Sequence, residues 1–296
     1  MVGHSIEKRD RKVTAALLAV QVFYGLHYLA AKWIVAEMEP GAWAVLRTGS
    51  ALLIMAAITL FMRRRLPPPG DVALLALCAF FGIVLNQALF LEGIARTTAA
   101  HSALINSQIP SFALLWALVL GHERLSRRKA LSFLVGMTGV LILLEAERFR
   151  FSTEYLAGDL LTIGNAASFG LFLVISRNVM RRSDPVAATL VVFFFGALGL
   201  SFYGAGNLAA ADFSALSARA IASMIFAVLA ATLATYYLNL WSLKRAQSSR
   251  VALFVFLQPL IASVAGLWLL DEIIGPRFFL AALLVIIALV LRDESS

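Results

Sequence analysis

Long apolar segments, separated by short polar or basic connections, follow one another along almost the whole chain. A helix needs about 20 apolar residues to cross a hydrocarbon core of about 30 Å. Segments close to that length predict ten membrane-spanning helices, at residues 13–35, 40–62, 72–92, 98–120, 130–144, 159–180, 185–203, 218–243, 251–270 and 276–291. Backbone groups find no hydrogen-bond partner in lipid, so each span must be helical. The predicted fold class is therefore all-α and integral to the membrane.

The second half of this pattern repeats the first. The matched pairs are Arg96 with Arg245, Pro110 with Pro259 and Glu123 with Glu272 at an offset of 149 residues, and Gly25 with Gly170, Lys32 with Arg177 and Pro40 with Pro185 at an offset of 145. The predicted halves are residues 1–145 and 146–296, with five spans each. Because five is odd, the second half must cross the membrane in the opposite sense, as an inverted repeat typical of transporters. Chance similarity between leucine- and alanine-rich segments is the alternative, but such composition does not supply matched prolines, glutamates and arginines.

The composition supports a membrane protein. Hydrophobic residues make up 61% of the chain and charged residues 14%, whereas a soluble domain carries about 25% charged residues. The single cysteine, Cys78, excludes an internal disulfide. The sequence shows neither a Cys/His cluster at metal-ligand spacing nor a P-loop, so we expect no metal and no cofactor.

The net charge of +8 alone could indicate a nucleic-acid partner. With the N-terminus placed in the cytoplasm, however, 18 of the 25 lysines and arginines fall in inner segments and only five in outer ones. Such a bias orients membrane proteins with positive loops inside. It predicts cytoplasmic N- and C-termini and explains the charge without nucleic acid.

Polar side chains recur at membrane depth, where they are costly and tend to face a cavity or the bundle interior. We predict that the following residues line a substrate-binding cavity: Gln21, Tyr24, Tyr28, Asn86, His101, Asn106, Asn165, Ser168, Tyr236, Asn239 and Gln258. The first three share one face of a helix. For each residue, the alternative is a hydrogen bond that only joins two helices.

Two prolines, Pro110 and Pro259, lie inside predicted spans, where each removes a helical hydrogen bond. We predict that they kink these helices and shape the cavity; a tolerated bend is the alternative. The five tryptophans lie toward span ends, which favours aromatic belts at the membrane surfaces.

Mid-span charge is almost absent, and no Asp or Glu lies at the centre of a predicted span. Lys32 and Arg47 lie near enough to the outer ends of their spans to reach the interface. We interpret His27 and His101 as buried structural histidines rather than proton carriers.

Several short sequences carry a family resemblance. The ten-span inverted pattern, GHERL at residues 121–125, LDEII at 270–274, Lys32 and Arg47 resemble the EamA-type members of the drug/metabolite transporter superfamily, and among them the YddG group of aromatic amino acid exporters. The resemblance implies a basket-shaped bundle in the bacterial inner (plasma) membrane. It further implies a central cavity lined by the first, third, fourth, sixth, eighth and ninth spans, and amino acid efflux. One departure is Asp271–Glu272, where the first half has His122–Glu123.

These observations predict a carrier that moves a neutral or zwitterionic solute, such as an amino acid, by rocking two halves about a midplane cavity. Without a mid-span carboxylate, we expect facilitated passage rather than carboxylate-based proton antiport. The expected partners are a small-molecule substrate and the lipid bilayer, and the pattern is compatible with a monomer. The alternatives are a proton-coupled drug/metabolite exporter, a passive channel and an integral membrane enzyme acting on lipid.

Overall fold

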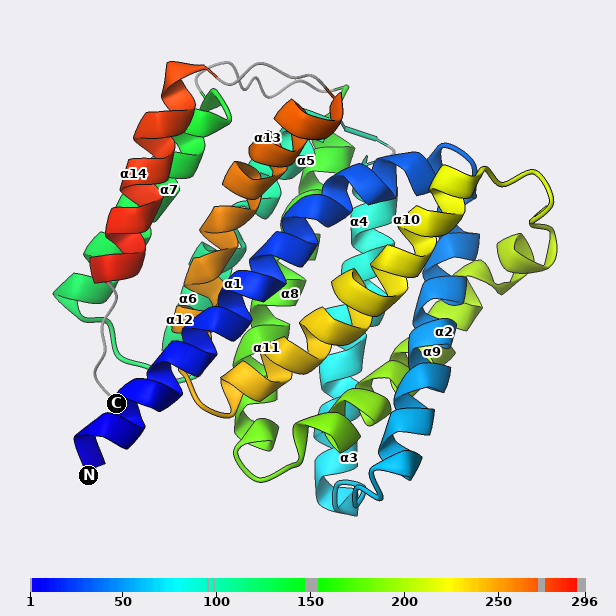
Figure 1. The fold of residues 1–296 in the computed structure, drawn as a ribbon, viewed down its shortest axis with the longest axis horizontal. Coiled ribbons are helices and arrows are strands. Elements are labelled where there is room, and N and C mark those ends of the chain that lie inside the picture. The colour runs from blue at the N-terminus through cyan, green and yellow to red at the C-terminus, as the bar shows by residue number, and fades with distance from the viewer. Residues whose placement is uncertain (1, 95, 98, 147–153, 271–274, 292–296) are drawn as a thin grey trace.

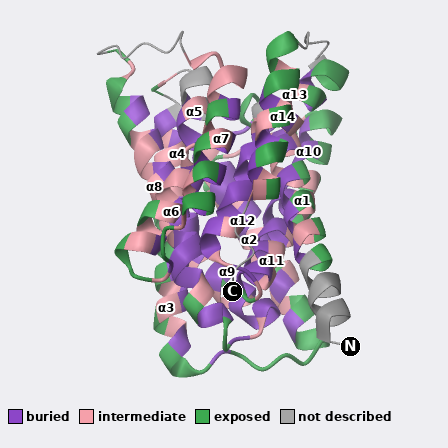
Figure 2. Cartoon of the chain, turned by 90° about the vertical axis from the view of Figure 1, so that its left-hand side faces the viewer, coloured by how far each residue is buried: buried purple, intermediate pink, exposed green. Residues whose placement is uncertain are grey.

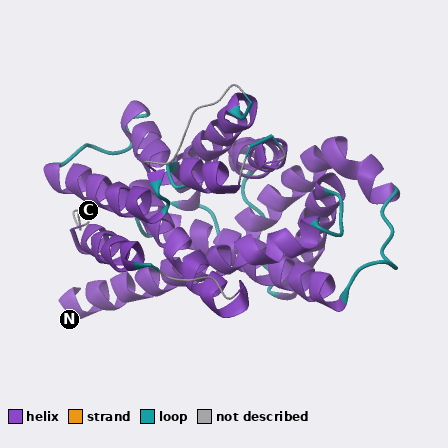
Figure 3. Cartoon of the chain, turned by 90° about the horizontal axis from the view of Figure 1, so that it is seen from above, coloured by secondary structure: helices purple, strands orange, loops and turns teal. Residues whose placement is uncertain are grey.

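The computed structural model describes residues 2–94, 96–97, 99–146, 154–270 and 275–291, and these residues form a helical bundle without strands (Figure 3). The α-helices are α1 (Val2–Val35), α2 (Pro40–Phe61), α3 (Pro69–Ala79), α4 (Asn86–Ile94), α5 (Ala99–Asn106), α6 (Ile109–Val119), α7 (Arg127–Leu143), α8 (Leu156–Met180), α9 (Pro185–Ala209), α10 (Ala218–Val228), α11 (Thr235–Leu243), α12 (Ser248–Leu253), α13 (Leu257–Leu270) and α14 (Pro276–Leu291). The π-helical segments η1 (Phe80–Leu85) and η3 (Leu229–Ala234) join α3 to α4 and α10 to α11, and the 3₁₀ segment η4 (Phe254–Phe256) joins α12 to α13. The all-α prediction is confirmed for the described residues.

Seven helical stretches of the described chain are long and apolar enough to cross a membrane. They are Arg11–Val35, Pro40–Phe61, Pro69–Gly93, Leu156–Met180, Pro185–Ala209, Ala218–Leu243 and Ser248–Leu269. Leu104–Val119 and Pro276–Leu291 are apolar but shorter, and α7 has 17 residues. The membrane character predicted from hydropathy is therefore confirmed, whereas the count of ten spans stays a prediction.

Capping residues set the helix ends. Asp184 precedes Pro185 at the start of α9, and its carboxylate accepts from the backbone N–H groups of Val186 and Ala187 at 3.0 and 3.2 Å. Such a cap satisfies donors that have no partner within the helix, and proline fits the first helical position. At the C-terminal end of α6, Gly121 adopts a φ of 67°, the left-handed conformation that glycine favours and that terminates helices.

The second half of the chain repeats the helix boundaries of the first. A shift of 149 residues moves the bounds of α3, η1 and α4 onto those of α10, η3 and α11. The same shift moves the first residue of α7 onto that of α14. The shift of 145 moves the first residue of α2 onto that of α9. Positions matched in the sequence therefore occupy matching places in the helices, including the π-helical segments, which we did not predict.

Equivalent helices of the two halves pack against each other in opposite directions. Helices α2 and α9 lie side by side (Figure 1). At one end of this pair, the Nη1 atom of Arg64 lies 3.5 Å from Oδ2 of Asp184. At the other end, the amide of Asn207 donates to Oε2 of Glu39 at 3.3 Å. The start of one helix therefore lies beside the end of the other.

The pair α7 and α14 shows the same antiparallel arrangement at the opposite edge of the bundle (Figure 1). Ser132, near the start of α7, donates to the Ala288 carbonyl near the end of α14 at 2.6 Å. A glycine in α7 allows close packing, since a Cβ atom added to Gly139 would lie 3.0 Å from the Ala281 carbonyl oxygen. Gly136 and Gly139 therefore lie in a helix contact, as glycines of membrane helices commonly do.

One end of the bundle holds a buried ionic link between the halves. Glu123, from the connection between α6 and α7, pairs with Lys129 at 2.8 Å. Its carboxylate also accepts hydrogen bonds from the side chains of Ser248 and Ser249 and from the Ser249 backbone N–H, at the start of α12. The Lys129 ammonium donates to Gln247 at 3.0 Å.

Buried residues lie mainly inside the bundle and exposed ones on its outer faces and ends (Figure 2).

Candidate functional site

A cavity of about 140 Å³ lies between the two halves of the bundle. Its lining residues come from helices of both halves, and most are polar or aromatic. They are Tyr24, His27, Tyr28, Ala31, Arg47, Asn86, Gln87, Phe90, Asn106, Ile109, Asn165, Phe169, Ala231, Thr232, Tyr236 and Gln258. No Asp or Glu belongs to this described lining, and the described residues hold no His/Cys/Asp/Glu group suited to a metal ion.

The structure brings most of the predicted site residues together. Those that line the cavity are Tyr24, Tyr28, Asn86, Asn106, Asn165, Tyr236 and Gln258. Gln21, Ser168 and Asn239 are buried outside its lining, and the side chain of His101 lies outside the described part of the structure. The cavity therefore contains only part of the predicted polar faces of α1, α8 and α11, since one predicted residue of each helix lies outside its lining.

The buried residues outside the lining hold lining residues in place. Gln21 is 1% exposed and accepts a hydrogen bond at 2.8 Å from the amide of Gln258. The Oε1 atom of Gln258 in turn lies 3.5 Å from the Tyr28 hydroxyl. Gln21 therefore orients Gln258 across the contact between α1 and α13.

Asn86 and Asn165 join α4 to α8. The Asn165 amide donates to the Asn86 carbonyl at 2.7 Å, and the Asn86 amide lies 3.4 Å from the Asn165 carbonyl. This reciprocal arrangement is the helix-joining alternative stated for polar residues at membrane depth. Both residues also line the cavity, so their amides stabilise its wall.

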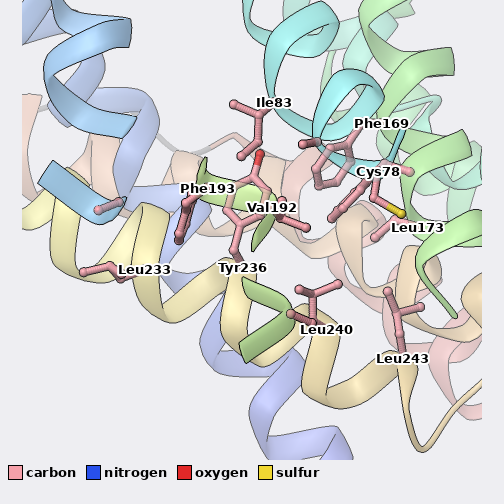
Figure 4. Packing of buried hydrophobic residues seen from close by; sticks show 14 of the residues in the cluster. Cys78, Ile83, Phe169, Leu173, Val192, Phe193, Leu233, Tyr236, Leu240 and Leu243 are labelled. Atoms are coloured by element: carbon pink, nitrogen blue, oxygen red, sulfur yellow. The ribbon is translucent and has the colours of Figure 1, made fainter. Parts of the chain in front are cut away.

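The π-helical segment η1 is stabilised by donors from the other half. A π-helical turn displaces the regular backbone hydrogen bonds and is frequent at functional sites. Ser168 donates to the Phe81 carbonyl at 2.7 Å, and the Tyr236 hydroxyl donates to the Gly82 carbonyl. Figure 4 shows the Tyr236 hydroxyl directed toward Ile83. These side chains therefore satisfy carbonyls of η1, and Ser168 has this role instead of facing the cavity.

The two prolines lie where helices are interrupted. Residues 107 and 108 separate α5 from α6, and Pro110 belongs to the first turn of α6. At the matching place, the 3₁₀ segment η4 precedes α13, which contains Pro259 in its first turn. Asn106, Ile109 and Gln258 line the cavity from these interruptions. Irregular backbone at membrane depth is tolerated where it is buried in protein or lines a cavity.

Similar proteins identify the family. The EamA-like transporter family model matches residues 12–145 and again residues 156–292. The chain belongs to the EamA-like transporter family. Among its relatives, an uncharacterized transporter of Archaeoglobus fulgidus is 24% identical over 83% of this chain and 84% of its own. The uncharacterized transporter YwfM of Bacillus subtilis is 26% identical over 84% of this chain and 81% of its own. A WAT1-related chloroplastic protein of Arabidopsis thaliana is 24% identical over 93% of this chain and 68% of its own.

A solved protein structure has a similar fold, with a TM-score of 0.78 and 19% identity, covering 95% of this chain and 97% of that one. As a member of the EamA-like family, the chain is a multi-pass membrane protein of a transporter family, and its substrate class is a small molecule. The names of these relatives state no solute, so the YddG group stays a prediction.

In this EamA-like protein, the cavity lining includes residues absent from the predicted set. Arg47 and His27 are its basic side chains, and the others are Ala31, Gln87, Phe90, Ile109, Phe169, Ala231 and Thr232. Arg47 is 7% exposed and lines the cavity, with its Nη1 atom 3.1 Å from Nε2 of His27. The expectation that Arg47 reaches the outer interface is therefore wrong. The guanidinium instead contacts His27 of α1 and lies over the ring of Trp43. Its neighbour Trp43 is 4% exposed, so this ring packs inside the bundle rather than on its outer surface.

Aromatic rings form one side of the site. The ring centroids of Phe169 and Phe172 are 5.5 Å apart, and the Tyr236 ring lies 5.8 Å from that of Phe172. The rings of Tyr236 and Phe193, which Figure 4 labels, are 5.3 Å apart. Phe169 and Tyr236 face the cavity, whereas Phe172 and Phe193 are fully buried behind them. Packed aromatic pairs of this kind fix ring positions. The cavity thus combines a rigid aromatic surface with polar groups.

Proposed function

We propose that this EamA-like protein exports amino acids, aromatic ones or other neutral or zwitterionic metabolites, by alternating access. The observation that carries the proposal is the cavity, which takes its polar and aromatic lining from both halves. A solute there contacts both halves at once, so a change in their relative position exposes it to either side. Interrupted helices at a midplane site are typical of secondary transporters.

The proposed topology is ten spans in two inverted five-helix repeats, residues 1–145 and 146–296, arranged as a basket-shaped bundle. The antiparallel packing of α2 on α9 and of α7 on α14 supports it, because each pair consists of equivalent helices. Seven of the ten proposed spans are the long apolar stretches. The three shorter ones are the segment α5–α6, helix α7 and helix α14.

The proposed orientation places both termini in the cytoplasm of a bacterial cell, with the protein in its plasma membrane. Contacts among basic connections support it. Arg182 pairs with Asp71, and Lys244 donates to the Ser183 carbonyl at 2.8 Å. The connections after α2, α8 and α11 therefore share one end of the bundle, and they carry most of the basic residues of the loops. A shared positive end faces the cytoplasm.

The proposed transport is facilitated. An ionised side chain at the membrane centre costs at least about 2.5–3.5 kcal/mol, so a carboxylate kept there for proton coupling would stand out. The described lining contains none. Purified protein in liposomes should therefore take up amino acids without an imposed pH gradient, and Tyr24→Ala should lower the rate while the purified yield stays the same.

Three measurements separate this proposal from its alternatives. Strict dependence of uptake on a pH gradient would replace it with a proton-coupled drug/metabolite exporter. Saturating uptake with counterflow is expected, whereas non-saturating flux or ion conductance would indicate a channel. A panel of amino acids, cationic dyes and sugars defines the solute class, with empty liposomes as the control.

A further inference from the structure

Arg47 is the only charged residue among the described residues that line the cavity. It extends from α2, and its guanidinium lies beside His27 of α1. Its Cζ atom is 5.9 Å from the ring centroid of Trp43. The ion pairs of the described residues involve other basic groups, and none supplies Arg47 with a carboxylate. Within the described chain, the buried guanidinium thus has an imidazole, a ring face and the nearby hydroxyls of Tyr24 and Tyr236 around it, but no carboxylate.

The hydrogen bond to His27 leaves donors unused. Arginine can only donate, so Nε2 of His27 must accept, and the hydrogen of the neutral ring then lies on Nδ1. The Nδ1 atom of His27 and the Nε atom of Arg47 are both buried without a partner in the described structure. Buried polar groups are normally hydrogen-bonded, and a native exception requires an explanation. An anionic group in the cavity beside Arg47 and His27 provides one.

The positive group exists in one half only. At the offset of 145, Arg47 corresponds to Val192 and His27 to Phe172, both fully buried and apolar. Tyr24 corresponds to Phe169, and both of these line the cavity. Matched positions of the two halves therefore supply part of the cavity wall. The Arg47–His27 pair has no counterpart at its matched positions and gives one side of the cavity a positive charge.

The remaining lining complements a molecule with an anionic end. Phe90, Ile109 and Phe169 offer apolar surface. Asn106, which lines the cavity and is 5% exposed, has a side-chain oxygen without a hydrogen-bond partner in the described structure. Such an oxygen accepts from an ammonium or amide donor. A carboxylate, an apolar body and a donor group would each find a matching surface.

We propose that Arg47, oriented by His27, is the subsite that binds the carboxylate of the transported solute. The inference rests on the proposed transport function and narrows its substrate class to molecules that carry a carboxylate. Guanidinium and carboxylate form paired, charge-assisted hydrogen bonds, which are stronger than bonds between neutral groups. Cationic amines that lack a carboxylate would meet an uncompensated positive charge.

The test compares three solutes that share a phenyl body: L-phenylalanine, 3-phenylpropionate and 2-phenylethylamine. Calorimetry on the detergent-purified protein measures their binding. We expect both carboxylates to bind at least about tenfold more tightly than the amine, and Arg47→Gln to remove that preference. Arg47→Lys should restore part of it, because the charge returns without the paired geometry. His27→Gln should weaken both carboxylates by a smaller factor.

The matched control is Arg177→Gln. It removes a half-buried guanidinium that does not line the cavity and that donates a hydrogen bond of 3.1 Å to the Ala246 carbonyl. Its solute preference should equal that of the wild type. The proposal is overturned if the amine binds wild type as tightly as the carboxylates, if neither carboxylate binds, or if Arg47→Gln binds them unchanged. Should Arg47→Gln fail to fold, the wild-type solute series still decides.

Liposome uptake separates this inference from the proposed function. Uptake of phenylalanine that survives Arg47→Gln with its preference intact defeats the subsite alone. Binding of both carboxylates to purified protein without any uptake by liposomes defeats the transport function and leaves the subsite standing. Equal binding of phenylalanine and 3-phenylpropionate identifies the carboxylate as the shared determinant. Tighter binding of phenylalanine would show that its ammonium group contributes to affinity in addition to the carboxylate.

Discussion

At the scale of single residues, two close helix contacts of the bundle fall at glycines that the sequence repeat pairs. Gly25 of α1 lies against Ile261 of α13, and Gly170 of α8 lies against Phe112 of α6. The offset of 149 that relates the halves also relates Phe112 to Ile261. Two glycines matched in sequence thus make equivalent contacts with two residues matched in sequence, and each contact leaves no room for a side chain.

At both glycines a methyl group would meet atoms that no rotamer change can move. A Cβ atom at Gly170 would lie 2.8 Å from the backbone nitrogen of Ala113, and one at Gly25 would lie 2.7 Å from Cβ of Ile261. The helices would have to shift to admit either methyl group. Gly170→Ala and Gly25→Ala should therefore each lower stability by about 1–3 kcal/mol.

Thermal unfolding in detergent measures both losses of stability. Gly206→Ala is the matched control, because it lies in α9 with no atom within 4 Å of an added Cβ. Alanine favours a helix over glycine, so this variant should unfold at the same temperature or higher. If Gly170→Ala were as stable as the control, the close approach of α6 and α8 would be wrong.

At the scale of helices, hydropathy predicts where each element lies but not its internal irregularities. The predicted span at residues 218–243 matches the stretch from α10 to α11, yet the π-helical segment η3 within it was not predicted. Carbonyls of η1 accept from Ser168 and Tyr236, which belong to other helices. These partners are remote in the sequence, so no local pattern contains them. At η3, by contrast, the hydroxyls of Thr232 and Thr235 donate to carbonyls of the same helical stretch.

The same limit explains why the burial of Arg47 could not be predicted from the sequence. Its distance from the start of α2 is compatible with a side chain that reaches the interface, and its burial comes from contacts with other helices, such as the one with His27 of α1. The shared face of Tyr24 and Tyr28 could be predicted, because their spacing along α1 places both side chains on one side of the helix. Which polar residues line the cavity, and which join helices, required the neighbouring helices.

The Glu123 link gives a prediction at the helix scale. Burial opposes ionisation of Glu123, but the hydrogen bonds from Lys129 and Ser249 outweigh burial, and the pKa of Glu123 lies below its ordinary 4.5. A carboxyl with a lowered pKa in the folded state stabilises the fold above its unfolded pKa. That contribution is lost as the pH falls from 4.5 through the folded pKa.

Glu123→Gln should therefore lower the unfolding temperature at pH 7 and narrow its gap to the wild type as the pH falls below 4.5. Removing one partner of a buried pair costs about 3–5 kcal/mol, because the other charge stays buried. The double variant Glu123→Gln/Lys129→Gln removes both charges and should recover part of this loss. Equal stability of all three proteins at pH 7 would show that the link between α6 and α12 is not formed.

At the scale of the whole molecule, the proposed inverted repeat assigns equivalent positions to opposite sides of the membrane. Arg128 and Arg277 are related by the offset of 149, and both are exposed near the starts of α7 and α14. Because α7 and α14 are antiparallel, these starts lie at opposite ends of the bundle. The link of Arg277 to Glu145, which follows α7, places it away from the Glu123 cluster.

Thiol labelling tests this assignment, since the native Cys78 is fully buried and can be replaced by alanine. A membrane-impermeant maleimide should label Arg277→Cys on intact cells and leave Arg128→Cys unmodified, with the reverse in inverted vesicles. Arg64→Cys is the control, because Arg64 belongs to the basic end and should follow Arg128. Labelling of Arg128→Cys and Arg277→Cys from one side would mean that the halves do not cross in opposite senses. A cavity shared by two inverted halves, and alternating access built on it, would then lose their basis. Opposite labelling would leave the motion between the halves as the remaining step to measure.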